Sequence, residues 1–253
     1  MLFNYLLICP LVFIAGYVDA IAGGGGLISL PAYMMTGLPV HNCIATNKMS
    51  SSMGTSVACW KYAKSGFIPW KSALFCIPCA FLGSSTGANI ALHISDGPFR
   101  VIMLIVLPLT GAYVLNKKDL KPSGKEYSSG ITIAISMLSS FLIGIYDGFY
   151  GPGTGTFLLL ILTGLARLPV FKANGLTKII NLSTNVSALA VFLLNAQVLF
   201  PLGVIAGAFN IAGNYLGARH FEKSGSKAVK PVIITVLVIF FIKVLSELIA
   251  AYI

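Results

Sequence analysis

The sequence predicts an all-α, polytopic membrane protein that is built from two inverted structural repeats. Three observations predict this fold class: the composition, a series of long apolar segments and a duplicated set of motifs. Of the 253 residues, 57% are hydrophobic and only 9% are charged, and the mean hydropathy is +0.88. Because a soluble domain carries about 25% charged residues, a water-soluble globule is excluded. We therefore expect the lipid bilayer to surround the chain.

Apolar stretches occur in two sets of five along the chain. They lie at about residues 2–22, 27–36, 42–63, 71–94, 98–116, 128–150, 154–165, 171–194, 199–219 and 231–253. Most reach the ~20 residues that a helix needs to cross the hydrocarbon core. The second stretch of each set is about half as long and follows glycines, which is typical of the discontinuous helices that form transporter binding sites. Each half is thus expected to hold about four helical elements plus one short glycine-led helix, broken or re-entrant.

The two halves repeat one another at a shift of about 128 to 130 residues. The matching pairs are Gly16-x-x-Asp19 with Gly144-x-x-Asp147, Gly23-x-Gly25 with Gly151-x-Gly153, Asn47-Lys48 with Thr177-Lys178, and Gly83-x-x-x-Gly87-Ala88 with Gly213-x-x-x-Gly217-Ala218. All of these pairs occur in the same order, which indicates a duplicated unit. We expect a first transmembrane repeat at residues 1–116, a cytoplasmic linker at 117–129 and a second transmembrane repeat at 130–253.

The basic residues predict the orientation of the chain in the membrane. The net charge of +10 does not indicate a nucleic-acid partner, because the cations are scattered between apolar runs. If each half crosses an odd number of times, one side receives every basic residue except Lys48, Arg100, Lys178 and Lys243. The positive-inside rule then places the linker in the cytoplasm and both termini outside, with the repeats inverted in the cell (inner) membrane.

Two lysines, Lys48 and Lys178, lie about six residues inside their apolar segments, roughly 9 Å from the segment ends. A lysine near the bilayer centre costs about 2.5–3.5 kcal/mol, which favours a functional role, although snorkelling to the nearer interface is the alternative. Hydroxyl and amide residues share the two helical faces by i+3, i+4 and i+7 spacing. One positive charge among neutral hydrogen-bonding groups suits a small oxyanion. The predicted substrate-binding residues on these segments are Asn47, Lys48, Ser51, Ser52, Thr55, Thr177, Lys178, Asn181 and Asn185.

Glycine-rich stretches precede both short segments. Neither is followed by the Lys-Ser/Thr pair of a P-loop, so nucleotide binding is not indicated. In a bilayer, non-helical backbone occurs only where it lines a cavity or is buried in protein. The N–H groups at the starts of the short helices could therefore bind the anion, and close helix packing is the alternative. This adds Gly24, Gly25, Gly153 and Thr154 to the predicted substrate site.

Asp19 and Asp147 each stand four residues before these glycines, and we assign them to coupling or gating. Three roles stay open for them: pairing with the lysines, accepting a coupling proton and capping a helix end. No Ser/His/Asp or Cys/His arrangement emerges, so we expect no enzymatic activity, no cofactor and no metal site. An alternative hypothesis is an intramembrane sulfur-transfer enzyme that uses Cys76 and Cys79.

Several motifs carry a family resemblance that covers essentially the whole chain. They are DAIAGGGGLISLP at residues 19–31, ATNK at 45–48 followed by Ser51 and Ser52, GFIPW at 66–70, DGFYGPGTGTF at 147–157, TKIINL at 177–182, and Gly217-Ala218-Arg219. These residues resemble the TauE/SafE sulfite exporter family, also called the toluene sulfonate uptake permease superfamily. The resemblance implies a secondary transporter of the cell membrane that exports small sulfur-containing anions such as sulfite, thiosulfate or organosulfonates.

The residues themselves favour alternating access at a midplane site between the two repeats. Protons are the candidate coupling ion, and a homo-oligomer is a candidate assembly. The alternative function is a passive anion channel of similar selectivity. A membrane scaffold or sensor is disfavoured, because no loop exceeds about 15 residues, far below the size of an output domain.

Overall fold

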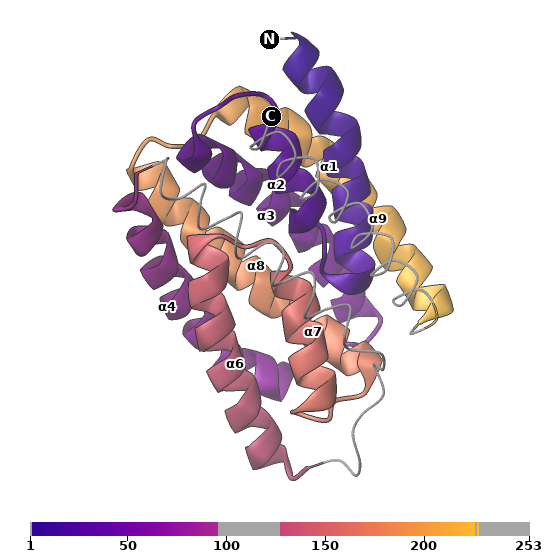
Figure 1. Cartoon of the computed structure of the whole chain (residues 1–253). Helices are drawn as coiled ribbons and strands as arrows, with labels where there is room; N and C mark the ends of the chain where they lie inside the picture. The colour runs from indigo at the N-terminus through magenta and orange to yellow at the C-terminus, as the bar shows by residue number, and fades with distance from the viewer. Residues whose placement is uncertain (1, 96–126, 226, 228–253) are drawn as a thin grey trace, which may run out of the picture.

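A computed structural model of the chain describes residues 2–95, 127–225 and 227. Within these residues the fold is all-helical (Figure 1). The helices are α1 (Leu2–Ala22), α2 (Gly26–Met34), α3 (Val40–Lys64), α4 (Trp70–Leu92), α6 (Ser129–Phe149), α7 (Thr154–Gly164), α8 (Val170–Leu194) and α9 (Phe200–Ser224). The apolar stretches predicted at 98–116 and 231–253, and the predicted linker except for its last residues, lie outside the described residues.

Every described helix falls on a predicted apolar stretch, so the prediction of an all-α membrane protein is confirmed. Only α9 ends clearly later than expected, at Ser224 rather than near residue 219. The helices α1, α4, α6 and α8 are long and apolar enough to cross a membrane. The helices α3 and α9 have 25 residues each but are more polar. Much of the polarity of α3 lies on buried side chains, which contribute to the site described below.

The two halves exchange helix contacts in the described part of the chain. Helix α1 packs along α9, and α6 packs along α4, so the first helix of each half contacts the fourth helix of the other. Helices α3 and α8 contact one another between these pairs. In Figure 1, α1 begins at the top and α6 at the bottom, and both end towards the middle. The inverted orientation of the halves in a membrane stays a prediction.

Glycines allow the exchanged helices to approach closely. The motif pairs Gly83/Gly87 on α4 and Gly213/Gly217 on α9 face the backbones of α6 and α1, respectively. A Cβ atom on Gly87 would lie 2.0 Å from the carbonyl oxygen of Ile145, which is closer than any real contact. Small residues at such contacts are a common means of packing membrane helices, because lipid supplies little hydrophobic drive for helix association.

The buried apolar side chains form two clusters, and each cluster draws on both halves of the chain. One includes Leu30 and Tyr33 together with Phe192, and the other includes Tyr62 together with Phe221. Neither half therefore has a core of its own among the described residues. The site lies beside the breaks that follow α1 and α6.

Candidate functional site

Two glycine loops cross at the centre of the molecule. One joins α1 to α2, and the other joins α6 to α7. A Cβ atom on Gly23 would lie 2.2 Å from the carbonyl carbon of Gly155 in the first turn of α7, so the backbone of the first loop touches the start of α7. Gly23, Gly151 and Gly153 have φ values of +73°, +100° and +86°, a region that glycine enters without the steric penalty of a side chain. Only glycine satisfies both requirements at Gly23.

Two buried ion pairs flank this crossing, and each joins one half of the chain to the other. Lys48 Nζ on α3 donates to Asp147 Oδ2 on α6 at 2.7 Å. Lys178 Nζ on α8 donates to Asp19 Oδ2 on α1 at 2.9 Å, and it also donates to the Asp19 carbonyl oxygen. Lys48 is 2% exposed and Lys178 is 0% exposed. The lysines thus reach an inward partner rather than snorkelling to an interface.

The position of both lysines follows from the helices that carry them. Each lies eight residues into a helix of 25 residues, about 12 Å along the axis from its start. Of the three roles open for Asp19 and Asp147, the structure shows pairing with the lysines. Their roles as proton acceptors stay a hypothesis.

A small polar cavity of about 30 Å³ lies beside the crossing loops. Ten of the predicted residues line it. They are Asp19, Gly25, Asn47, Lys48, Ser51, Thr55, Asp147, Thr154, Asn181 and Asn185. The structure therefore brings together residues that the sequence places on both halves, including the start of α7 and the faces of α3 and α8.

Five predicted residues do not line the cavity. They are Gly24, Ser52, Gly153, Thr177 and Lys178. The Ser52 hydroxyl donates to the Lys48 carbonyl oxygen of its own helix at 2.7 Å. Gly153 forms the turn that begins α7, and Thr177 is fully buried away from the cavity.

Sequence reasoning missed several cavity residues. They are Ala15, Gly23, Gly26, Ser29, Gly151, Gly155 and Asn210. Of these residues, Asn210 is the least expected, because it lies on α9, far in sequence from both lysine motifs. It pairs with a second amide one turn later, since Asn214 Nδ2 donates to Asn210 Oδ1 at 2.7 Å. Two amides spaced i, i+4 in an apolar segment were the sequence signal that could have indicated it.

Hydrogen-bond donors in the cavity are available to a ligand. Within the described residues, the side chains of Asn47 and Ser51 make no hydrogen bond, although both line the cavity. Asn181 accepts from Asn185 Nδ2 at 2.9 Å through its Oδ1 atom, which leaves its own Nδ2 without an acceptor in this part of the chain. Thr55 is engaged, because its hydroxyl donates to Asp19 Oδ2 at 3.4 Å. Ammonium, amide and hydroxyl donors thus converge on one small space.

The arrangement favours anion binding over chemistry on a thiol or a metal. The five cysteines are free thiols, and Cys76 and Cys79 on α4 do not line the cavity. No cluster of three or more His, Cys, Asp or Glu residues occurs among residues 2–95, 127–225 and 227. Lys48 and the carboxyl groups of Asp19 and Asp147 line the cavity, and Lys178 pairs with Asp19 from outside it.

Comparison with known proteins supports the same class of function. A family model described as sulfite exporter TauE/SafE matches residues 8–244. The chain is 34% identical to "Probable membrane transporter protein ORF9" of Sinorhizobium sp. over 93% of this chain and 90% of the relative. It is 32% identical to a "Probable membrane transporter protein" of Haemophilus influenzae over 88% and 87% of the two chains. It is 28% identical to YfcA of Escherichia coli K12, also described as a membrane transporter, over 92% and 87%. No solved structure matches the chain.

Proposed function

The chain belongs to the sulfite exporter TauE/SafE family of membrane transporters, and on that premise we propose that it carries small sulfur-containing anions. Sulfite, thiosulfate and organosulfonates are the proposed substrates, and export is the proposed direction. The chain acts as a secondary transporter by alternating access, with its cavity between the two halves. It lies in the cell (inner) membrane with the linker in the cytoplasm and both termini outside.

The single observation that carries the proposal is the cavity that contains Lys48 between the halves. A charged lysine is costly inside a membrane, and such residues normally mark the path of an ion or substrate. Lys48 is accompanied by the donors of Asn47, Ser51 and Asn181, which make no other donor contact within the described residues. A sulfite or sulfonate group presents three oxygen atoms that accept charge-assisted and neutral hydrogen bonds from such donors.

Alternating access is supported by the way in which the ion pairs cross between halves. Lys48 pairs with Asp147, and Lys178 pairs with Asp19, so each pair links a helix of one half to a helix of the other. A movement that separates α3 from α6, or α8 from α1, breaks these contacts. The cavity is lined by residues of both halves, so a rearrangement that breaks these pairs also changes the shape of the site.

Flux in proteoliposomes tests the proposal. Purified full-length protein is reconstituted, and uptake of radiolabelled sulfite is measured with and without unlabelled sulfite inside the vesicles. We expect saturable uptake that is accelerated by the internal sulfite. Uptake that neither saturates nor is accelerated by internal sulfite, together with a linear current, would replace the transporter by a passive anion channel.

A matched pair of variants tests the site. Lys48→Met and Lys71→Met each remove one positive charge, but Lys71 is exposed at the start of α4. We expect Lys48→Met to abolish sulfite flux and Lys71→Met to retain it, with both proteins eluting as folded monodisperse particles in detergent. Flux that persists in Lys48→Met would remove Lys48 and its cavity from the mechanism.

A further inference from the structure

The two ion pairs correspond in sequence, but their contacts differ. Lys48 lines the cavity, and its ammonium group donates to Asp147 Oδ2 alone among the described residues. Lys178 lies behind the cavity and donates to both the carboxylate and the main-chain carbonyl of Asp19. Lys178 therefore binds a helix end as well as a side chain, whereas Lys48 binds only a side chain.

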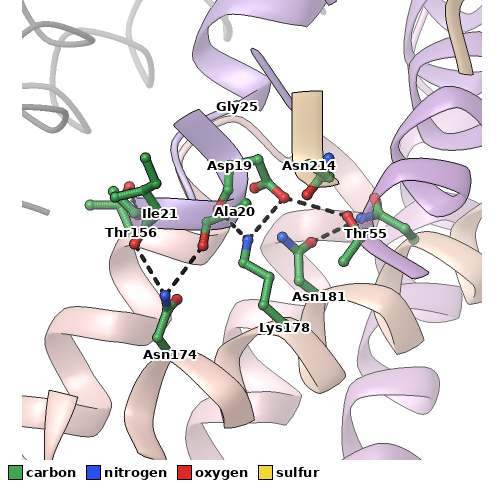
Figure 2. Close-up of polar contacts among 12 residues, drawn as sticks. Asp19, Ala20, Ile21, Gly25, Thr55, Thr156, Asn174, Lys178, Asn181 and Asn214 are labelled. Carbon is green, nitrogen blue, oxygen red and sulfur yellow. Dashed lines mark hydrogen bonds and ion pairs between the residues drawn. The ribbon is translucent and has the colours of Figure 1, made fainter. Parts of the chain in front are cut away.

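The end of α1 is capped by further side chains (Figure 2). A helix that ends inside a membrane leaves its last carbonyl groups without intrahelical donors, so other groups must satisfy them. Asn174 Nδ2 donates to the carbonyl oxygens of Ala20 at 3.2 Å and Ile21 at 3.1 Å. Tyr62 Oη also donates to Ala20 at 2.7 Å. Thr156 Oγ1 donates to the carbonyl of Ala22 at 2.9 Å. Lys178 is thus one of four side chains that fasten this end.

The side chains that cap α1 have apolar counterparts at the corresponding positions around α6. The shift of about 128 to 130 residues relates Tyr62 to Phe192, Asn174 to Ile44 and Thr156 to Ile28. Phe192, Ile44 and Ile28 are all buried, and their hydrocarbon side chains have no hydrogen-bond donor. The cap on α1 therefore has no counterpart at these positions around α6.

We propose that a single anion binds at Lys48, where it takes the place of the Asp147 carboxylate, while the Lys178–Asp19 pair stays closed and fastens the end of α1. This inference rests on the proposed function and assigns different roles to two lysines that look alike in sequence. One lysine binds substrate. The other is a positioning residue.

The contacts and the surroundings of Lys48 favour replacement of the Asp147 carboxylate by an anion. Removing Asp147 from Lys48 breaks one side-chain contact, whereas removing Asp19 from Lys178 also disturbs the cap on α1. A sulfur oxyanion and a carboxylate are similar partners for an ammonium group, because both accept charge-assisted hydrogen bonds. Gly151 leaves this pair open, since a Cβ atom there would lie 3.1 Å from both Lys48 Nζ and Asp147 Oδ1.

Three double variants of the full chain test the inference. Lys48→Met/Asp147→Asn and Lys178→Met/Asp19→Asn each remove a whole ion pair, so that no buried charge is left without a partner. Tyr62→Phe/Asn174→Ile gives the end of α1 the residue types found around α6, and neither position lines the cavity. Sulfite affinity is measured by radioligand binding in detergent, and the Tm of each variant is measured without ligand.

We expect the two readouts to separate the roles of the pairs. The Lys48/Asp147 variant should bind sulfite at least about 30-fold more weakly, because a buried charged contact to the ligand is lost. The Lys178/Asp19 and Tyr62/Asn174 variants should both melt at lower temperature. The Tyr62/Asn174 variant should retain the affinity within about twofold, because neither residue lines the cavity. The Lys178/Asp19 variant should lose less affinity than the Lys48/Asp147 variant, although Asp19 does line the cavity. If Lys178→Met/Asp19→Asn fails to fold, the Tyr62/Asn174 variant still decides the question.

Contrary outcomes are distinguishable. Equal losses of affinity in the two ion-pair variants, or a loss confined to the Lys178/Asp19 or Tyr62/Asn174 variant, overturn the inference and leave the proposed function intact. An unaltered protein that neither binds nor transports sulfite, thiosulfate or a sulfonate overturns both. A stoichiometry of two anions per chain also overturns the inference, because it assigns a ligand to each lysine.

Discussion

The contact between the loop that follows α1 and the first turn of α7 can be tested by placing one methyl group at Gly23. This residue has φ +73°, and an added Cβ would lie 2.2 Å from the backbone of Gly155. Ordinary contacts of a Cβ atom begin near 3.4 Å. The nearby atoms are backbone rather than the flexible end of a side chain, so they cannot move aside without separating the loop from α7. Gly23→Ala should therefore disturb the crossing directly.

The structure also supplies a control with the same backbone conformation. Gly37 has φ +74°, and nothing lies within 4 Å of the position that its Cβ would take. Gly37→Ala should incur only the left-handed conformational penalty of about 1–2 kcal/mol. Gly23→Ala should incur this penalty and, in addition, about 1–3 kcal/mol for overpacking. The difference between the two variants isolates the contact between the loop and α7.

Thermal melting in detergent, followed by sulfite flux, measures this difference. For a chain of this size, 1 kcal/mol corresponds to about 2–4 °C in Tm. We expect Gly23→Ala to melt at least about 2 °C below Gly37→Ala and to lose flux, which Gly37→Ala retains. Equal Tm values for the two variants would refute the reasoning that the loop touches α7 at this point.

Three further predictions concern the ion pair, a packed glycine and the topology. Lys48→Met and Asp147→Asn should each lower stability by about 3–5 kcal/mol, because each leaves a buried partner unpaired, and the double variant should lose less than their sum. Additive losses in thermal melts would contradict the pairing. Gly54→Ala should lower Tm and flux, since its Cβ would lie 1.8 Å from Asn210 Oδ1, whereas Gly164→Ala, with open space, should leave both unchanged. A reporter at the N-terminus should be accessible from outside intact cells, and a cytoplasmic signal would contradict the inverted topology.

Much of the helical layout could be predicted from the sequence because hydrophobicity is a local property. Long apolar stretches separated by polar or glycine-containing segments mark the helices with little dependence on their neighbours. The same holds for the buried lysines, since a cation inside an apolar segment is conspicuous wherever the segment packs. Ten cavity residues were found in this way, because helical spacing places them on the face of a lysine or next to a glycine break.

The partners of these residues could not be predicted, because they come from distant parts of the chain. Asp147 lies 99 residues after Lys48, and Lys178 lies 159 residues after Asp19. The sequence left pairing, proton acceptance and helix capping equally open for both aspartates. The structure shows that both lysines are paired with these aspartates and that only Lys48 lines the cavity.

By itself the sequence determined that the chain is a helical membrane protein with a repeated set of motifs and two cations inside apolar segments. The tertiary structure decided that α1 packs on α9 and α6 on α4, which brings each lysine to an aspartate of the other half. It also decided that the two lysines differ. Their sequence motifs match, but the caps that surround Lys178 come from Tyr62, Thr156 and Asn174, and the residues corresponding to these are apolar. A repeated motif specifies which groups are present, whereas the packing of distant helices specifies which contacts each group makes.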